Sequence, residues 1–311
     1  MLSRVADNLY WMSRYLERAE HTARIMGVHL NLMLEREPSS EGRRWWHVLA
    51  VLGSSEHVEG DPFVAAETYA LDQITTSIAA ARDNARQVRE QISSEMWEQL
   101  NRLYHESRRT GTAQFWRTQA LDLLLAVTES SHLFQGITDS TMIHGEGWQF
   151  IQMGRFMERV QATARLIDLH FGEFFHAGAE PMIASDHVEW IGLLRSCTAF
   201  EAYCKVYTAE LRPERVAEFL LLNPEFPHSV RFAVEQLRKS LESVDTGSAR
   251  RFERLNKLAG RLTAALSYTP LDEIMSDLHE FSMNIRRLCG NIHAGIYQVY
   301  IRYPIEAALE A

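Results

Sequence analysis

The sequence predicts an all-α protein, and three observations support that fold class. Apolar residues recur at three- and four-residue spacing along most of the chain, which is the period of a helix with one buried face. No proline lies between Pro62 and Pro181, and the chain has neither alternating β-branched runs nor Asn-Gly turns. The chain has 311 residues, 46% of them hydrophobic, so it is long enough to bury a sizeable core. We therefore expect antiparallel helical bundles with long helices and short connections.

Helix ends are expected where Pro, Gly, Asn and Ser residues cluster. The stretch FLLLNPEFP (219–227), for example, reads as a helix that stops at Asn223 before a proline, rather than as a membrane anchor. Helices are expected between successive breaks, which in chain order are 38–42, 54–62, 109–112, 136–147, 175–185, 223–227, 244–248 and 268–270.

Composition excludes several classes of protein. The formal net charge of −9 argues against a nucleic-acid partner, because phosphate contacts need a dense cationic face. No apolar run approaches the roughly 20 residues that span a bilayer, so we expect no membrane partner. The start MLSRVADNLYWMSRYLER carries charges too early for the apolar region of a signal peptide. The three cysteines form no CxxC pair and do not suggest a disulfide framework. These features predict a cytoplasmic protein.

A repeated segment is the strongest sign of internal organisation. RYLERAEHTARI (14–25) and RFMERVQATARL (155–166) share six of twelve residues at an offset of 141 (155 − 14). A weaker echo relates 84–92 to 229–237, and Trp46 and Trp190 fall in order between the two matches. We therefore predict two pseudo-symmetric antiparallel helical bundles, 1–142 and 143–311, which arose by duplication and pack as one compact unit.

The charged residues of the repeat lie off the apolar face of their own helix. At about 100° per residue, the apolar side chains of each copy share one arc, and a charged set occupies the opposite arc. That set is Arg14, Glu17, Arg18, His21 and Arg24 in the first copy, and Arg155, Glu158, Arg159 and Arg165 in the second. Between the copies the apolar letters change, whereas four charged residues are identical.

Three interpretations of the charged face remain open. A solvated face would hold ion pairs one turn apart, each contributing only about 0.2–0.5 kcal/mol. A structural latch would bury Glu–Arg contacts where the two halves meet, giving specificity of docking more than stability. A binding site would use guanidinium groups to hold a ligand carboxylate or phosphate. The excess of arginine, 29 of 32 basic residues, suits such planar contacts but is equally explained by a GC-rich genome.

Both copies resemble the two Glu-Arg signatures of the bacterial alpha-E family. The matching stretches are YWMSRYLERAEHTARI and GWQFIQMGRFMERVQATARLID, and the resemblance continues through 80–101, 193–207 and 214–232. It places the family signature on Glu17, Arg18, Glu158 and Arg159, and the 80–101 segment adds Arg82, Asn84 and Arg86. One departure is His228, which stands where family members often have a basic residue.

The resemblance implies partners rather than a reaction. Family members are typically encoded beside, or fused to, a circularly permuted ATP-grasp protein, and often near a transglutaminase-like protein. ATP-grasp enzymes activate a carboxylate as an acyl phosphate and join it to an amine. The resemblance therefore implies a role in a peptide- or amide-ligating system.

Motifs for other chemistry are missing from the sequence. We find no GxxxxGK[ST] loop, no GxGxxG after a strand, no HExxH and no GxSxG, so no cofactor is expected. Helical bundles hold di-iron sites with paired ExxH motifs, but Glu129–His132 has no helical partner, because Glu225–His228 contains Pro227. We therefore expect no metal site.

Two further residues complete the candidate binding set. His144 lies in the connection that enters the second signature helix, from which it could reach a site between the halves. Arg231 matches Arg86 in the weaker echo. The full set for ligand or partner binding is Arg14, Glu17, Arg18, Arg24, Arg82, Asn84, Arg86, His144, Arg155, Glu158, Arg159, Arg165 and Arg231.

Three functional hypotheses follow. The first is an accessory or substrate-binding component of an ATP-grasp amide-ligase system that uses the duplicated Glu-Arg faces. The second is an enzyme of the transferase or ligase type, with Glu17 or Glu158 as general base. The third is a structural dimerisation module. The sequence also allows a homo-oligomer.

Overall fold

Side-chain caps and prolines begin several helices of the chain. Asp61 accepts a hydrogen bond from the backbone N–H of Phe63 at the start of α3, which opens with a proline in its first turn. Ser229 and Asp277 accept from the third residue beyond them and so begin α10 and α13. These caps satisfy N–H groups that a helix leaves without intrahelical partners.

The computed structural model describes residues 3–33, 41–54, 60–110, 113–175, 184–208, 210–244 and 249–301. Within these ranges every regular element is helical, which confirms the all-α class. The first five helices are α1 (Ser3–Met33), α2 (Glu41–Leu52), α3 (Pro62–Gln87), α4 (Ser94–Thr110) and α5 (Ala113–Thr141). The rest are α6 (Glu146–Phe174), α7 (Ala184–Ser196), α8 (Phe200–Tyr207), α9 (Pro213–Leu222), α10 (Val230–Glu242), α11 (Ala249–Tyr268), α12 (Leu271–Ser276) and α13 (Leu278–Ile296), followed by the π-helix η2 (Tyr297–Ile301).

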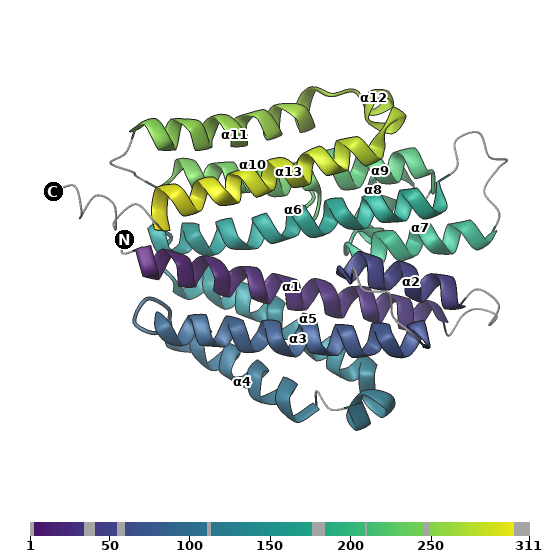
Figure 1. The fold of residues 1–311 in the computed structure, drawn as a ribbon, viewed down its shortest axis with the longest axis horizontal. Coiled ribbons are helices and arrows are strands. Elements are labelled where there is room, and N and C mark those ends of the chain that lie inside the picture. Colours follow the sequence, from purple (N-terminus) through teal and green to yellow (C-terminus); the bar gives the residue numbers. More distant parts are fainter. Residues whose placement is uncertain are drawn as a thin grey trace.

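Helices α1 and α6 lie side by side through the middle of the molecule and run in the same direction (Figure 1). Gly154 of α6 approaches α1 so closely that a Cβ atom there would lie 2.2 Å from the carbonyl oxygen of Tyr10. Glycine is therefore required at this crossing, because any larger residue would push the two helices apart. This close packing brings the two repeated segments face to face.

The neighbours of this central pair are antiparallel to it, as the sequence predicts. On one side, Arg4 near the start of α1 bonds Gln87 at the end of α3. On the other side, Phe150 near the start of α6 packs against Tyr300 in η2. The parallel central pair is a difference from a purely antiparallel bundle, and the close approach of Gly154 to Tyr10 is part of this parallel packing.

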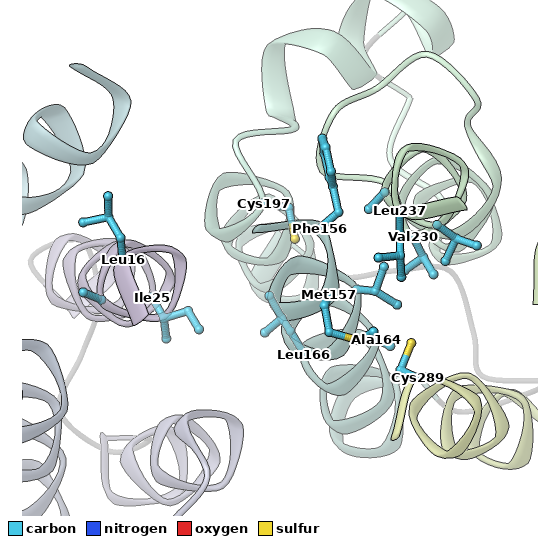
Figure 2. Packing of buried hydrophobic residues seen from close by; sticks show 14 of the residues in the cluster. Leu16, Ile25, Phe156, Met157, Ala164, Leu166, Cys197, Val230, Leu237 and Cys289 are labelled. Carbon is cyan, nitrogen blue, oxygen red and sulfur yellow. The ribbon is translucent and has the colours of Figure 1, made fainter. Parts of the chain in front are cut away.

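Apolar side chains fill the outer sides of the central helices. Figure 2 shows Met157 on the side of α6 that faces α10 and Cys289 of α13, away from α1. Leu16 of α1 points away from α6 (Figure 2), and all of these residues are buried. The predicted apolar arcs therefore pack within their own halves, and the charged arcs are left at the interface between α1 and α6.

Several expected helix ends differ from the structure. The break predicted at 136–147 is shorter, because α5 continues to Thr141 before α6 begins at Glu146. Four breaks were not predicted, at 88–93, 197–199, 208–212 and 277. None of them contains a proline or glycine, although Pro213 directly follows the third and opens α9. Parts of the expected breaks, namely 38–40, 55–59, 111–112, 176–183 and 245–248, lie outside the described residues. In the described part of the chain no helix is both long and apolar enough to cross a membrane.

The weaker echo does not correspond in structure. Residues 84–92 end α3 and enter the following turn, whereas 229–237 cap and begin α10. Trp190 is buried, but Trp46 is 40% exposed and its neighbour Trp45 is the buried one. The predicted duplication therefore rests on the 141-residue repeat, and the boundary between 142 and 143 stays a prediction.

Candidate functional site

Glu158 on α6 receives two arginines from α1. Its Oε2 accepts from Arg14 Nε at 2.7 Å, and its Oε1 accepts from Arg18 Nε at 2.6 Å. Arg14 is 5% exposed and Glu158 is 7% exposed, so the contact is not that of a solvated face. Charge-assisted bonds of this length are about twice as strong as neutral ones.

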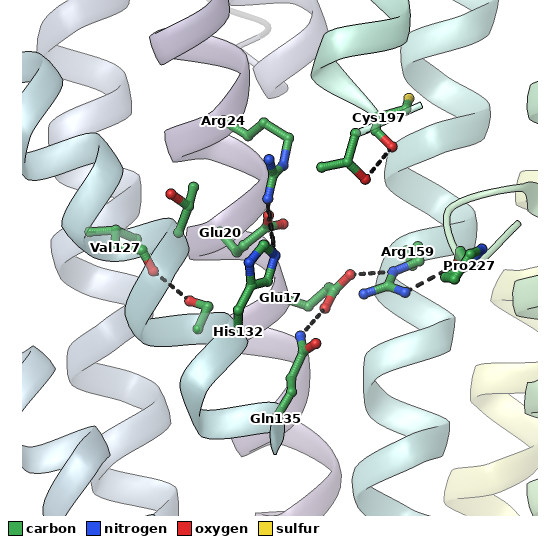
Figure 3. Close-up of polar contacts among 12 residues, drawn as sticks. Glu17, Glu20, Arg24, Val127, His132, Gln135, Arg159, Cys197 and Pro227 are labelled. Atoms are coloured by element: carbon green, nitrogen blue, oxygen red, sulfur yellow. Dashed lines mark hydrogen bonds and ion pairs between the residues drawn. The ribbon is translucent and has the colours of Figure 1, made fainter. Parts of the chain in front are cut away.

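Glu17 on α1 receives Arg159 of α6, as Figure 3 shows, and lies near Arg155 of the same helix. Its Oε1 accepts from Arg159 Nε at 2.5 Å, and Arg155 Nε lies 4.0 Å from its Oε2. Gln135 of α5 also donates to Glu17 at 3.3 Å. Each repeated Arg-x-x-Glu-Arg thus places its glutamate between the two arginines of the other copy. We call these six residues the Glu-Arg latch: Arg14, Glu17, Arg18, Arg155, Glu158 and Arg159.

The latch keeps both glutamates ionised despite their burial. Burial by itself raises the pKa of Glu17, but Arg159 and Arg155 outweigh it and hold that pKa below its ordinary value. The pKa of Glu158 is likewise lowered, because Arg14 and Arg18 offset its burial. Removing one partner from such a buried pair leaves an uncompensated charge, which costs about 3–5 kcal/mol.

A cavity of about 490 Å³ opens beside the latch. Arg18 and Glu158 form one part of its lining, and Arg165 of α6 and Arg286 of α13 add two more guanidiniums. The uncharged side chains of Tyr69, Gln73 and Gln161 also line it. This volume is within the range that small-molecule sites occupy. We call it the arginine cavity.

Arg165 is held in the cavity without a carboxylate partner among the described residues. Burial lowers its pKa, and the nearby Arg286 lowers it further. The guanidinium lies against Gly53 at the end of α2, where a Cβ atom would come within 2.8 Å of Arg165 Nη1. Gly53 also has a positive φ of 107°, so glycine serves both the turn and the close approach.

The equivalent residue of the first copy, Arg24, has different surroundings. It forms an ion pair with Glu20 one turn earlier on α1, and it contacts His132 of α5 at 3.2 Å (Figure 3). In the second copy, Gln161 stands where the first copy has Glu20. The two copies therefore differ in one charge, and only Arg24 is neutralised within its own helix.

A second cavity of about 430 Å³ lies on the other side of α6. Arg155, Arg159 and Lys239 line it together with Asp139. The Nε of Arg155 is buried without a hydrogen-bond partner among the described residues, and burial lowers the pKa of this arginine to about 10. The latch arginine Arg155 is therefore less well satisfied than its counterpart Arg14, which also contacts the Tyr10 hydroxyl.

Three histidines cluster in the core between α1, α2 and α6. The ring centroids of His29 and His47 are 6.4 Å apart, and those of His47 and His170 are 5.6 Å apart. One ring nitrogen of each has no hydrogen-bond partner among the described residues. Burial lowers the pKa of His29 to about 3 and that of His47 to about 4. Among the described residues, no group of three or more His, Cys, Asp or Glu is arranged to hold a metal ion.

Other predicted site residues lie apart from the latch and the arginine cavity. Arg82 bonds Asn101 and stacks over Tyr104, where it joins α3 to α4. Asn84 donates to a carbonyl of its own helix, and Arg86 pairs with Asp83 on the surface.

His144 and Arg231 also make local contacts. His144 is exposed and stacks on Trp148 in the loop before α6. Arg231 pairs with Glu235 one turn along α10.

Sequence reasoning missed Arg286, Tyr69 and Gln73, which line the arginine cavity from α13 and α3. No local pattern marks them, because only the packing of these helices against α1 and α6 brings them to the repeated segments.

His228, the departure from the family pattern, lies near Arg159. Burial lowers the pKa of His228 well below its ordinary value, and the charge of Arg159 lowers it further.

Comparison with known proteins gives a family but no solved relative. Residues 1–301 match a family model described as a predicted alpha-helical domain with a conserved ER motif, named Alpha-E. Three mycobacterial proteins described as uncharacterised, one from Mycobacterium bovis and two from strains of Mycobacterium tuberculosis, are each 22% identical over 326 aligned positions. The match covers 95% of this chain, which spans 36% of the length of those relatives. No solved structure matches the chain. On the family match, the chain belongs to the Alpha-E family.

Proposed function

We propose that the chain is the anion-binding helical component of an amide-ligating system, in which an ATP-grasp partner carries out the chemistry. The observation that carries this proposal is Arg165, a half-buried guanidinium in a cavity with no described carboxylate paired to it. A carboxylate or phosphate is the ligand that a guanidinium fork binds best.

Several features support a component rather than a complete enzyme. The matched mycobacterial proteins are much longer than this chain, so the corresponding region there is part of a larger protein. Glu17 and Glu158 are poor candidates for a general base, because such a base needs a pKa near the working pH. Arginines hold the pKa of both glutamates below the ordinary value, and each carboxylate already accepts bonds from two or more side chains.

The test is an amide-ligation assay with ATP and glutamate, using the chain alone, a permuted ATP-grasp protein from the same genome alone, and both together. We expect turnover only when the ATP-grasp protein is present, and faster turnover when this chain is added. Arg165→Gln should remove most of that stimulation, whereas Arg86→Gln, on the surface of α3, should leave it unchanged. Turnover by the chain alone, or full stimulation by Arg165→Gln, would contradict the proposal.

A further inference from the structure

The charges that line the arginine cavity do not balance. Three guanidiniums face it, from Arg18, Arg165 and Arg286, and Glu158 is the one carboxylate in its lining. That carboxylate is already occupied, because it accepts from Arg14 and Arg18. The described lining therefore carries two net positive charges, three guanidiniums less one carboxylate, although the whole chain has a formal charge of −9.

The two excess charges belong to Arg165 and Arg286. They come from different helices, α6 and α13, and neither forms an ion pair with a described carboxylate. Within the described part of the chain, the hydrogen bond that Arg286 donates is a weak one, 3.6 Å from its Nη1 to the sulfur of Met283. Each guanidinium raises the electrostatic cost of the other, since burial and then Arg286 lower the pKa of Arg165. A ligand with one negative charge would offset half of this excess, and a ligand with two would offset all of it.

Gln161 lines the cavity but supplies no negative charge to Arg165 and Arg286. Its amide oxygen accepts from Arg14 Nη2 at 3.3 Å, and its amide nitrogen faces the sulfur of Met157 at 3.8 Å. In the first copy a carboxylate, Glu20, occupies the equivalent place and pairs with Arg24. An uncharged residue at 161 thus leaves Arg165 available to a ligand.

We infer that the arginine cavity selects small dianions, either dicarboxylates or phosphate monoesters, over monoanions, with Arg165 and Arg286 as the recognition pair and Gln161 as the residue that leaves them unneutralised. This inference rests on the proposed function and adds the charge class of the ligand. Tyr69 and Gln73 line the same cavity and supply neutral hydrogen-bonding groups for the rest of the ligand.

The experiment is isothermal titration of the full chain at pH 8 with two matched pairs of probes. Glutarate is compared with glutaramate, and methyl phosphate with dimethyl phosphate, so each pair differs by one negative charge. We expect the dianion of at least one pair to bind at least about tenfold more tightly than its monoanion. The pair with the tighter dianion identifies a carboxylate or a phosphate source.

Four variants make the outcome specific. Arg286→Gln should remove the preference for the dianion while weaker binding persists, and Gln161→Glu should weaken dianion binding at least about tenfold. Glu20→Gln, the matched change in the first copy, should leave binding at the cavity unchanged. If monoanions and dianions bind with equal affinity and Arg165→Gln still abolishes binding, this inference is overturned but the proposed function stands. No binding of any probe, or binding that survives Arg165→Gln, would overturn both.

Discussion

Arg24 on α1 and Arg165 on α6 occupy the same position of the repeated sequence segment, 141 residues apart (165 − 24). Arg24 is paired with Glu20 and contacts His132, so its charge is met within the protein. Arg165 faces a cavity, and the neutral Gln161 stands in the place of that glutamate. The difference teaches that a repeated motif can form the same latch on both helices while only one copy leaves an arginine without a described carboxylate partner.

The Glu-Arg latch, which precedes these two arginines on α1 and α6, should give the largest loss of stability when it is changed. Glu158→Gln would leave Arg14 and Arg18 without their shared carboxylate, and we expect the free energy of unfolding to fall by about 3–5 kcal/mol. Glu17→Gln should cost a similar amount, because its surroundings are reciprocal. Chemical denaturation measures both. A loss below about 1 kcal/mol for either would show that the latch behaves as a surface pair.

His29 and His170 form a second pair of residues at equivalent positions. Unlike the two arginines, both histidines should contribute to the pH dependence of stability in the same way. Both are buried, and burial lowers the pKa of His29 to about 3 and that of His170 well below its ordinary value. Below pH 6.5 the unfolded chain therefore binds more protons than the folded chain. Stability is complete above this pH and is lost as the pH falls toward 3.

His29→Gln measures this contribution. Over that pH range each histidine contributes at most about 1.4 kcal/mol per pH unit. In denaturation curves at pH 7, 6 and 5, the variant should lose stability less steeply than the parent chain. An unchanged slope would mean that His29 titrates normally in the folded state.

Gly53→Ala tests whether the turn positions Arg165. The added methyl group would meet the guanidinium of Arg165. The alanine would also have to adopt a left-handed backbone conformation, which costs roughly 1–2 kcal/mol. Gly60→Ala is a suitable control, because Gly60 also has a positive φ but open space around it. Both variants should be destabilised in denaturation, but only Gly53→Ala should also weaken glutarate binding. Equal binding by the two would disconnect Gly53 from the cavity.

Removal of Arg24 and removal of Arg165 should change stability in different directions, and the sign is what the comparison predicts. Arg24→Gln should lower the free energy of unfolding by about 1–3 kcal/mol, since it leaves Glu20 buried beside His132. Arg165→Gln should leave stability unchanged or raise it by up to about 1 kcal/mol, because it removes a half-buried charge without a described counter-ion. Destabilisation of equal size in both variants would remove the distinction between the two copies.

The central features of the fold could be predicted because they depend on local pattern. Helical periodicity predicts the all-α class, and the wheel correctly places Glu17 and Glu158 off the apolar face of their own helices. The wheel does not reveal what meets that face, since only tertiary packing sets α1 and α6 parallel, with Gly154 against Tyr10. Tyr69 and Gln73, which line the cavity, are on α3, as are Arg82, Asn84 and Arg86. The last three lie near the other end of α3, so position on this helix did not allow the cavity residues to be predicted from sequence.

Crystals soaked in selenate would test the central claim most directly, because selenium can be located by anomalous diffraction and selenate is a small dianion. If Arg165 and Arg286 form the recognition pair, a selenium peak will lie in the arginine cavity, with selenate oxygens within hydrogen-bonding distance of both residues. A peak beside Arg24, or none in the cavity while Arg165 and Arg286 remain exposed to the soaking solution, would contradict it.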